Sequence, residues 1–543
     1  MTTTVEPLLP ATRPSFYDRW ASRVRADPAI AQRIGWLAPV LVTLLAGILR
    51  FWNLGDPHAI VFDETYYVKD AWSQWNLGYP ANWPDGADPK FLAGQSDIFL
   101  KTGSFVVHPP LGKWIIGAGM WLFGPDSTAG WRFSVALFGT ATVLVLYLVA
   151  KSLTRSTVFA TVAAFLMAID GLAIVLSRVA LLDGILTFFL LLAFWFAILD
   201  RERHVGRLER TLAARAEGAE PPAWGPFLWG RPWLLAAGAA AGAATAVKWS
   251  GLYVIAAIGI YAVVSDALAR RRGGVRLWPA DALRQAVPAF LALVPIALVV
   301  YLFSWTGWFL TSGGYDRHAA DLAPATGFWS WVPRSVQSLW IYHQAMYQFH
   351  IGLTTPHSYA SPAWQWPMLV RPTSMYWHQD KLGEAGCTAV NSCVQAISSI
   401  PNPLIWWAGI AAAIYLVYAF AVRRDWRYAI VLTGVAATYL PWLMYPERTI
   451  FQFYTVAMLP FTILALAFAL REIARGGHPR TPPDLDEETV AELAVRRRTT
   501  GQRVVLVFLV VVTLLSAFWY PVWTAWDVPY DYWRLHNWVP TWV

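Results

Sequence analysis

The sequence has almost no cysteine, no internal repeat and no cleavable leader. Its two cysteines, Cys387 and Cys393, are too few for a zinc site built from cysteines. No sustained repeat, heptad or low-complexity stretch is present. A transporter would predict internal repeats and charges at mid-bilayer, so it is only a distant alternative. Residues 1–33 lack an apolar segment with a small-residue cleavage site, and we expect no removable signal peptide.

Apolar residues dominate the composition. Of the 543 residues, 57% are hydrophobic and 33 are tryptophan, and the mean hydropathy is +0.41. Successive apolar runs of about 20 residues are long enough to cross a bilayer as helices. The sequence therefore predicts an all-α polytopic membrane protein with about eleven transmembrane helices. They are expected near residues 34–53, 129–150, 156–176, 179–199, 232–249, 251–268, 285–303, 402–421, 428–444, 451–470 and 504–523.

Basic residues predict the orientation, because short cytoplasmic loops retain Lys and Arg. With the N-terminus inside, the cytoplasmic segments hold 28 of the 42 Lys and Arg. The net charge of +8 mostly reflects this bias, so nucleic acid is not an expected partner. The C-terminus then lies outside the cytoplasmic membrane, and so does the loop that contains Cys387 and Cys393. We expect these two residues to form a disulfide.

The predicted spans divide the chain into four parts. These are a cytoplasmic tail (1–33), a catalytic module of seven spans (34–303), an extracytoplasmic loop (304–401) and a module of four spans (402–543). The first module includes a second long extracytoplasmic loop, 54–128. Within that loop, residues 114–123 are apolar but too few to cross a bilayer, and they predict an interfacial helix.

Two adjacent acids, Asp63 and Glu64, follow the first span and are the strongest candidates for chemistry. A carboxylate just outside the bilayer is where an enzyme needs a base to act on a lipid-borne substrate. Neighbours diverge by about 100° on a helix, so the two acids must have different roles. Asp63 is expected to begin a helix that runs through Tyr67 and Asp70. Acids also suit a helix N-terminus on electrostatic grounds alone, and the sequence leaves that explanation open.

Several charged residues lie near the ends of predicted spans rather than in cytoplasmic loops. Such groups are usually paired or functional, although charges that snorkel to the interface are the ordinary alternative. The ammonium of Lys248 and the guanidinium of Arg132 suit phosphate or carboxylate. The residues are Lys113, Arg132, Arg178, Asp183, Lys248 and Arg448.

Two further strings suggest contact with a substrate. In His108-Pro-Pro-Leu-Gly-Lys113, the prolines fix the backbone that carries His108 and Lys113. The string from His357 to Pro367 includes Trp364 and Trp366, and its aromatic rings suit sugar stacking or peptide contact. A structural corner explains the first string equally well, and an interfacial aromatic belt explains the second.

Taken in order, these motifs resemble the protein O-mannosyltransferases of the actinobacterial type, within the GT-C glycosyltransferase superfamily. The matching strings are the acid pair, His108 to Lys113, Trp131-Arg132, Lys248-Trp-Ser-Gly251 and His357 to Pro367. The resemblance implies transfer of mannose from polyprenyl-phosphate mannose to Ser or Thr of proteins, with the secretion machinery as an expected partner. It implies that Asp63 is the catalytic aspartate, Glu64 its partner, Arg132 their support and Lys248 a ligand of the donor phosphate.

The mechanism we expect is a single inverting displacement. Asp63 accepts the proton of the acceptor hydroxyl, and Lys248, assisted by Lys113, stabilises the leaving phosphate. Arg132 keeps Asp63 ionised. His108, His357, Trp364, Trp366 and Arg448 are candidates for binding the acceptor or the sugar. The arrangement demands no metal or other cofactor. The main alternative is a related transferase that delivers another polyprenyl-phosphate sugar, such as an arabinose derivative, to a glycolipid or wall glycan.

Overall fold

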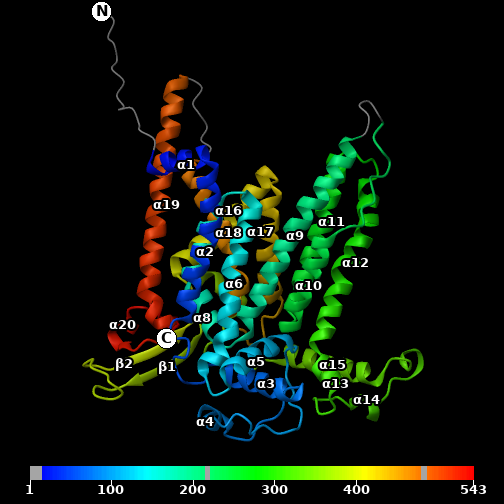
Figure 1. Cartoon of the computed structure of the whole chain (residues 1–543), viewed down its shortest axis with the longest axis vertical. Coiled ribbons are helices and arrows are strands. Elements are labelled where there is room, and N and C mark those ends of the chain that lie inside the picture. The colour runs from blue at the N-terminus through cyan, green and yellow to red at the C-terminus, as the bar shows by residue number, and fades with distance from the viewer. Residues whose placement is uncertain (1–14, 215–219, 478–485) are drawn as a thin grey trace, which may run out of the picture.

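The computed structural model describes residues 15–214, 220–477 and 486–543. Long helices form an upright bundle, and the shorter elements gather at one end of it (Figure 1). The bundle helices are α2 (Pro28–Phe51), α6 (Thr128–Thr154), α7 (Thr157–Ile169), α8 (Gly171–Arg178), α9 (Leu182–Ala213), α10 (Pro232–Val247), α11 (Gly251–Arg272), α12 (Trp278–Ser304), α16 (Pro403–Arg423), α17 (Trp426–Tyr439), α18 (Leu459–Ala474) and α19 (Glu487–Trp523). A short helix, α1 (Phe16–Ala26), precedes α2.

The predicted spans all coincide with helices, but their number is not confirmed. In the described residues, seven helices are long and apolar enough to cross a membrane. An eighth span results if α7 and α8, which are bent by 60°, count as one. The predicted spans at 232–249, 428–444 and 451–470 correspond to shorter helices of 16, 14 and 16 residues. The count of eleven therefore stays a prediction.

Polar side chains cap the N-termini of helices that follow a turn in the chain. The Asp27 carboxylate accepts from the backbone N–H of Ala29 and Ile30 and so begins α2. Asp170 caps α8 at the break after α7. The carbonyls left free at that break accept hydrogen bonds from the fully buried Arg50 of α2. The break therefore persists without unpaired backbone in the bundle.

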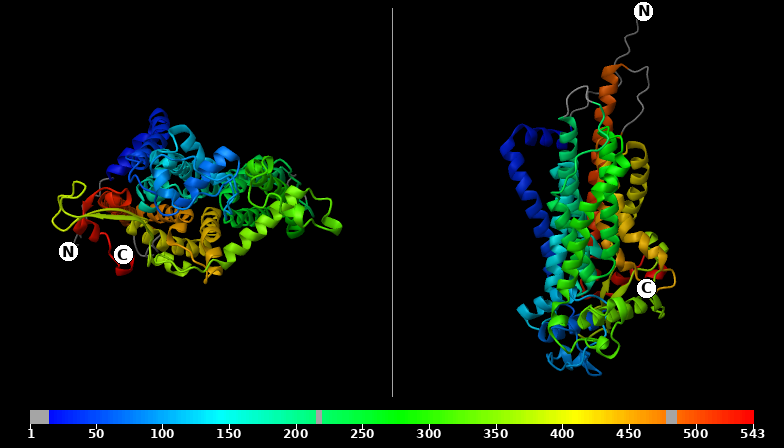
Figure 2. Two further views of the ribbon diagram at one scale, coloured as in Figure 1. Left: turned by 90° about the horizontal axis from the view of Figure 1, so that it is seen from below. Right: turned by 90° about the vertical axis from the view of Figure 1, so that its right-hand side faces the viewer.

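The end that carries α3 (Glu64–Leu77), here called the Asp63 end, is built from short elements. They are α4 (Ala87–Leu92), α5 (Leu111–Phe123), α13 (Thr306–Leu310), α14 (Ala319–Leu322), α15 (Arg334–Gly352), α20 (Tyr530–Arg534) and the 3₁₀ helices η1 (Gly327–Trp329), η2 (Ala363–Met368), η3 (Leu440–Met444), η4 (Gln452–Ala457) and η5 (Pro540–Trp542). The helix α5 contains the predicted interfacial segment and has only 13 residues. Seen from below, the molecule is elongated, with α19 toward one end and α12 toward the other (Figure 2).

The Asp63 end also contains a small antiparallel sheet that the sequence analysis missed. Its strand order is β1 (Ser374–Asp380), β2 (Cys393–Ser398) and β3 (Val528–Pro529). The expected disulfide is confirmed, since Cys387 and Cys393 are bonded within this hairpin. Because β3 follows α19, the sheet ties the C-terminal segment to the loop between α12 and α16.

Candidate active site

The two adjacent acids stand at the start of α3. Phe62 adopts a left-handed conformation (φ 50°), and the helix begins at Glu64 with Asp63 as its N-cap. The Asp63 side chain makes no capping hydrogen bond, so its carboxylate is not used to begin the helix. The prediction of a helix that starts at this pair is confirmed.

Both carboxylate oxygens of Glu64 accept hydrogen bonds from neighbouring groups. Arg132 of α6 donates to both carboxylate oxygens, from Nε to Oε1 at 2.8 Å and from Nη2 to Oε2 at 2.9 Å. The backbone N–H groups of Val61 and Ala180 also donate to this carboxylate, each at 2.8 Å. Glu64 and Arg132 are both 0% exposed. This geometry makes Glu64 a support that joins α3, α6 and the start of α9 rather than a group free to react.

Asp63, by contrast, has a free carboxylate. Among the described residues it has no hydrogen bond or ion pair, although it is largely enclosed. Burial raises the pKa of Asp63 to about 6, while Lys248 opposes the shift and Asp183 adds to it. The expectation that Arg132 keeps Asp63 ionised is corrected, because Arg132 binds Glu64 and the nearby cation is Lys248. Free and moderately basic, Asp63 is suited to accept a proton.

Lys248 directly follows α10 and is held by Asp183 at the start of α9. Its Nζ donates to both Asp183 carboxylate oxygens at 2.9 Å and lies 4.5 Å from the centroid of the Tyr454 ring. Both side chains are at least nine-tenths buried. Asp183 was noted in the sequence for its place near a span end, but no partner followed from it. An anion that reaches Lys248 must compete with the Asp183 carboxylate.

A cavity opens beside this ion pair. Its polar side contains Lys248, Asp183 and Tyr454, and its apolar side combines aliphatic residues of α9, α17 and η4 with Pro441 and Trp442 of η3. The chemistry of this lining matches a phosphate attached to an apolar chain. The lining residues are Asp183, Leu186, Leu190, Lys248, Ser250, Tyr253, Ala437, Thr438, Pro441, Trp442, Tyr454 and Ala457.

Arg448 binds His350, and both His350 and His108 are close enough to Lys248 for its charge to act on them. Arg448 Nη2 donates to His350 Nδ1 at 3.1 Å, and His350 Nε2 contacts the Val107 carbonyl at 2.7 Å. His350 must therefore be neutral with its proton on Nε2. Burial, followed by Arg448, lowers the pKa of His350 to about 4. The His108 ring is tilted against that of His350, with 5.2 Å between their centroids, and burial together with Lys248 holds the pKa of His108 well below the usual value. The Arg448 Nε is buried without a partner.

Lys113 is not placed to hold a phosphate, which corrects its predicted role. Its Nζ donates to the carbonyls of His108 and Pro109 at 2.7 and 3.2 Å. The residue is 1% exposed, and burial lowers its pKa to about 8. Lys113 therefore fixes the turn that positions His108.

In the string from His357 to Pro367, one tryptophan lies in the core and the other lies on the surface. Trp366 is 1% exposed and donates to the Ser361 carbonyl, so its assignment to substrate contact is wrong. Trp364 is 59% exposed and remains a candidate. The exposed His357 ring lies 5.9 Å from Phe62, the neighbour of Asp63. Of this string, His357 is therefore the residue best placed beside the acid.

The sequence analysis missed His350, Tyr454 and the role of Asp183. His350 lies in the last turn of a helix rich in aromatic residues, and this sequence context by itself does not distinguish a site from an interface. Arg178, which was flagged, binds the carbonyls of Arg50, Trp52 and Asn53 and so fixes the end of α2. Among the described residues, no group of three or more His, Cys, Asp or Glu is arranged to hold a metal ion.

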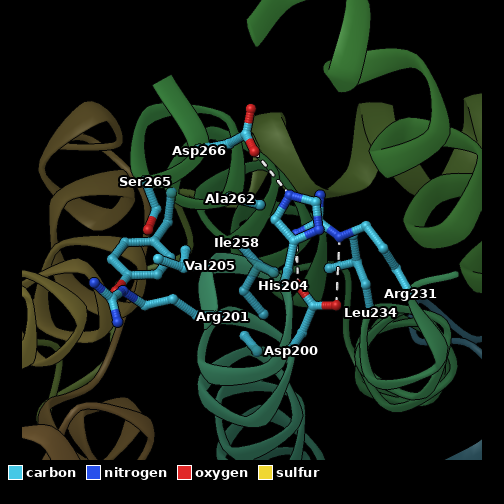
Figure 3. A pocket seen from close by; sticks show the side chains of 12 residues that line it. Asp200, Arg201, His204, Val205, Arg231, Leu234, Ile258, Ala262, Ser265 and Asp266 are labelled. Carbon is cyan, nitrogen blue, oxygen red and sulfur yellow. Dashed lines mark hydrogen bonds and ion pairs between the residues drawn. The ribbon is translucent and has the colours of Figure 1, made fainter. Parts of the chain in front are cut away.

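A second polar cavity lies at the opposite end of the bundle (Figure 3). There Asp200 binds Arg231 at 2.5 Å, and His204 binds Asp266 at 2.7 Å. Asp266 also pairs with Arg270. These buried charges neutralise one another and join α9, α10 and α11. The cluster therefore holds these three helices together, and it lies far from Asp63.

Comparison with known proteins places this geometry in context. Residues 40–208 match the family model for dolichyl-phosphate-mannose-protein mannosyltransferase. Residues 335–542 match the C-terminal four TMM region of protein-O-mannosyltransferase. Both segments contribute to the site, because the first contains Asp63, Glu64 and Arg132 and the second contains Arg448.

Individual relatives resemble nearly the whole chain. The polyprenol-phosphate-mannose–protein mannosyltransferase of Mycobacterium tuberculosis is 35% identical, covering 94% of this chain and 92% of the relative. The protein of that name from Corynebacterium glutamicum is 31% identical, covering 92% and 91%. The solved Saccharomyces cerevisiae protein O-mannosyltransferase Pmt1-Pmt2 complex bound to the sugar donor has a TM-score of 0.65 at 15% identity, covering 93% of this chain and 92% of the yeast chain. That match shows a shared fold.

Proposed function

Because this chain belongs to the protein O-mannosyltransferase family and is a membrane-embedded glycosyltransferase, we propose that it transfers mannose from polyprenyl-phosphate mannose to Ser or Thr hydroxyls of proteins. The names of its relatives support this donor and a protein acceptor. The observation that carries the proposal is the free Asp63 carboxylate, close enough to Lys248 for its pKa to respond to that charge, with Lys248 lining a cavity that has one polar and one apolar side.

The reaction we propose is one displacement. The acceptor oxygen attacks the anomeric carbon of mannose, its proton passes to Asp63, and the bond to the phosphate oxygen breaks with its electron pair on the phosphate. The polyprenyl phosphate is a weak base, so its departure needs cations rather than a general acid. Lys248 and Arg448 supply that charge, and Glu64 with Arg132 holds Asp63 in position. No step is assigned to a metal.

The donor and the acceptor reach Asp63 from different sides in this proposal. The polyprenyl chain follows the apolar side of the cavity, so that its phosphate meets Lys248 and Tyr454. The protein acceptor approaches past His357 and Trp364, which are exposed. We propose that this end is extracytoplasmic, with the N-terminus in the cytoplasm, because the Lys- and Arg-rich loops lie at the other end. Its acceptors are then proteins that cross or leave the cytoplasmic membrane, which suggests coupling to secretion.

Replacement of Lys248 by methionine is expected to raise the KM for the donor by roughly 10- to 100-fold, the effect of losing one charge-assisted hydrogen bond. Asp183→Asn is the matched control, because it removes the carboxylate that competes for the ammonium and keeps the cation. We expect that control to leave the donor KM unchanged or lower. Both variants are compared by initial rates at varied donor concentration and by thermal unfolding. An unchanged KM in a folded Lys248→Met protein would remove Lys248 from the donor site.

The pH dependence of the transferase activity is expected to follow the ionisation of Asp63. A general base acts only when it is ionised, and burial raises the pKa of Asp63 to about 6. Activity should therefore be full above this pH and fall about tenfold per unit below it. The measurement is kcat/KM for transfer between pH 4.5 and 8 (roughly the range over which such a base titrates). Nearly full activity at about pH 4.5, as expected for a carboxyl with its ordinary pKa near 4, would show that the titrating group is not Asp63.

The remaining enzymatic alternative is a related transferase that glycosylates a glycolipid or a wall glycan. The test is purified protein in nanodiscs, supplied with radiolabelled polyprenyl-phosphate mannose and offered a Ser/Thr-rich peptide or a glycolipid. Label on the peptide supports the proposal. Label confined to the glycolipid, from protein that binds the donor, overturns it in favour of the alternative.

A further inference from the structure

The segment between α14 and α15 exposes an unusual number of large apolar side chains. Residues 322–333, here called the aromatic tip, read Leu-Ala-Pro-Ala-Thr-Gly-Phe-Trp-Ser-Trp-Val-Pro and contain no charge. Leu322 is 92% exposed, Phe328 76%, Trp329 62% and Trp331 71%. The only ring contact within the tip joins Phe328 to Trp329, so its rings are not covered by other aromatic side chains in the described residues.

The tip is nevertheless a defined turn. The N–H of Ser330 donates to the Gly327 carbonyl and that of Val332 to the Trp329 carbonyl. The Gln337 side chain accepts from the Ala325 N–H and donates to the Val332 carbonyl, each at 2.7 Å. These bonds anchor both ends of the tip to α15. The rings are therefore held outward by the backbone.

The tip lies near the end of α12 (Figure 1). That helix is long and apolar enough to cross a membrane. Its last turns expose Val299 (61%) and Phe303 (75%), and Leu310 of α13 follows at 80%. In Figures 1 and 2 the tip segment lies at the Asp63 end and projects outward beside the end of α12. The backbone of the tip therefore lies close to the end of a helix that is apolar enough to cross a membrane.

We propose that the aromatic tip inserts into the lipid leaflet on the Asp63 side and anchors α15 to the membrane surface. Tryptophan and phenylalanine on an uncharged segment suit the boundary between head groups and acyl chains. A protein partner is less well matched, because the neighbouring end of α12 also exposes apolar side chains, although the charges of Asp321 and Arg334 flank the tip itself.

The helix α15 connects the anchored tip to the catalytic site. The helix begins at Arg334, directly after the tip, and carries His350, which binds Arg448. Insertion of the tip therefore fixes the height of the Arg448 side chain relative to the leaflet that holds a lipid donor. The lipid contact itself does not depend on which sugar or acceptor the enzyme uses.

The test uses the absence of a free thiol in the described chain, since both cysteines form the disulfide. Trp331→Cys, labelled with a polarity-sensitive fluorophore and placed in nanodiscs, should emit at shorter wavelength and be quenched by lipids that carry a nitroxide. Lys90→Cys is the matched control, because Lys90 is an exposed charged residue of α4, away from the disulfide, and should report water. A water-like, unquenched label at position 331 overturns the proposal. A shielded label without lipid quenching also overturns it, and energy transfer between labelled copies would then identify a second copy as the occupant.

Discussion

Replacement of Asp63 by asparagine is expected to lower kcat for mannosyl transfer by about 10²- to 10⁴-fold, the usual contribution of a general base. The substitution keeps the size of the side chain, and no hydrogen bond of the Asp63 carboxylate is lost in the described structure. Stability should therefore change little. Donor binding should be retained or improved, because a negative charge near the phosphate site is removed.

The measurement is single-turnover transfer to a Ser/Thr-rich peptide, together with donor binding and thermal unfolding of the same preparation. Asp85→Asn is the matched control, since Asp85 is an exposed acid in the same loop region. We expect that control to transfer mannose at the wild-type rate. Normal transfer by a folded Asp63→Asn protein would show that another group accepts the proton.

Replacement of Arg132 by methionine is expected to destabilise the protein by about 3–5 kcal/mol, because it leaves a buried carboxylate without its partner. Glu64 would keep only the N–H groups of Val61 and Ala180. Arg132 also donates to the carbonyls of Pro57 and Ala59, so the loop before α3 would loosen as well. Activity should fall with stability, since Asp63 stands on the same turn.

The double variant Arg132→Met with Glu64→Gln separates charge from packing. Removing the charge on Glu64 should recover a large part of the lost stability, because the penalty of an unpaired buried ion disappears. Both variants are compared by thermal unfolding in one detergent. A double variant that is no more stable than Arg132→Met would show that the guanidinium acts through packing and its carbonyl contacts alone.

The sequence predicted the positions of the helices well, because apolar runs and caps are local properties of the chain. It also predicted that Asp63 and Glu64 must differ in role, since helix geometry separates neighbours. The resemblance implied that Arg132 supports the acid pair, but neither the acid that it binds nor the pairing of Lys248 with Asp183 was predicted. Arg132 and Glu64 are 68 residues apart, and Lys248 and Asp183 are 65 apart. Only the packing of the helices selects these partners.

Two other differences have the same origin. Trp364 and Trp366 stand in one string, and which ring enters the core depends on the contact of η2 with Trp442 and Tyr454. The sheet at the Asp63 end forms between β1 and β2 and recruits β3 from beyond the last bundle helix. Two residues of β3 carry no detectable strand pattern by themselves.

The anomeric configuration of the product tests the central claim most directly. Nuclear magnetic resonance of the mannosylated peptide, formed from a donor of known configuration, reports whether the sugar carbon is inverted. A single displacement with Asp63 as base predicts inversion, so the product carries the configuration opposite to that of the donor. Retention would contradict the account, because it requires a second displacement through an intermediate that Asp63 acting as a base does not form.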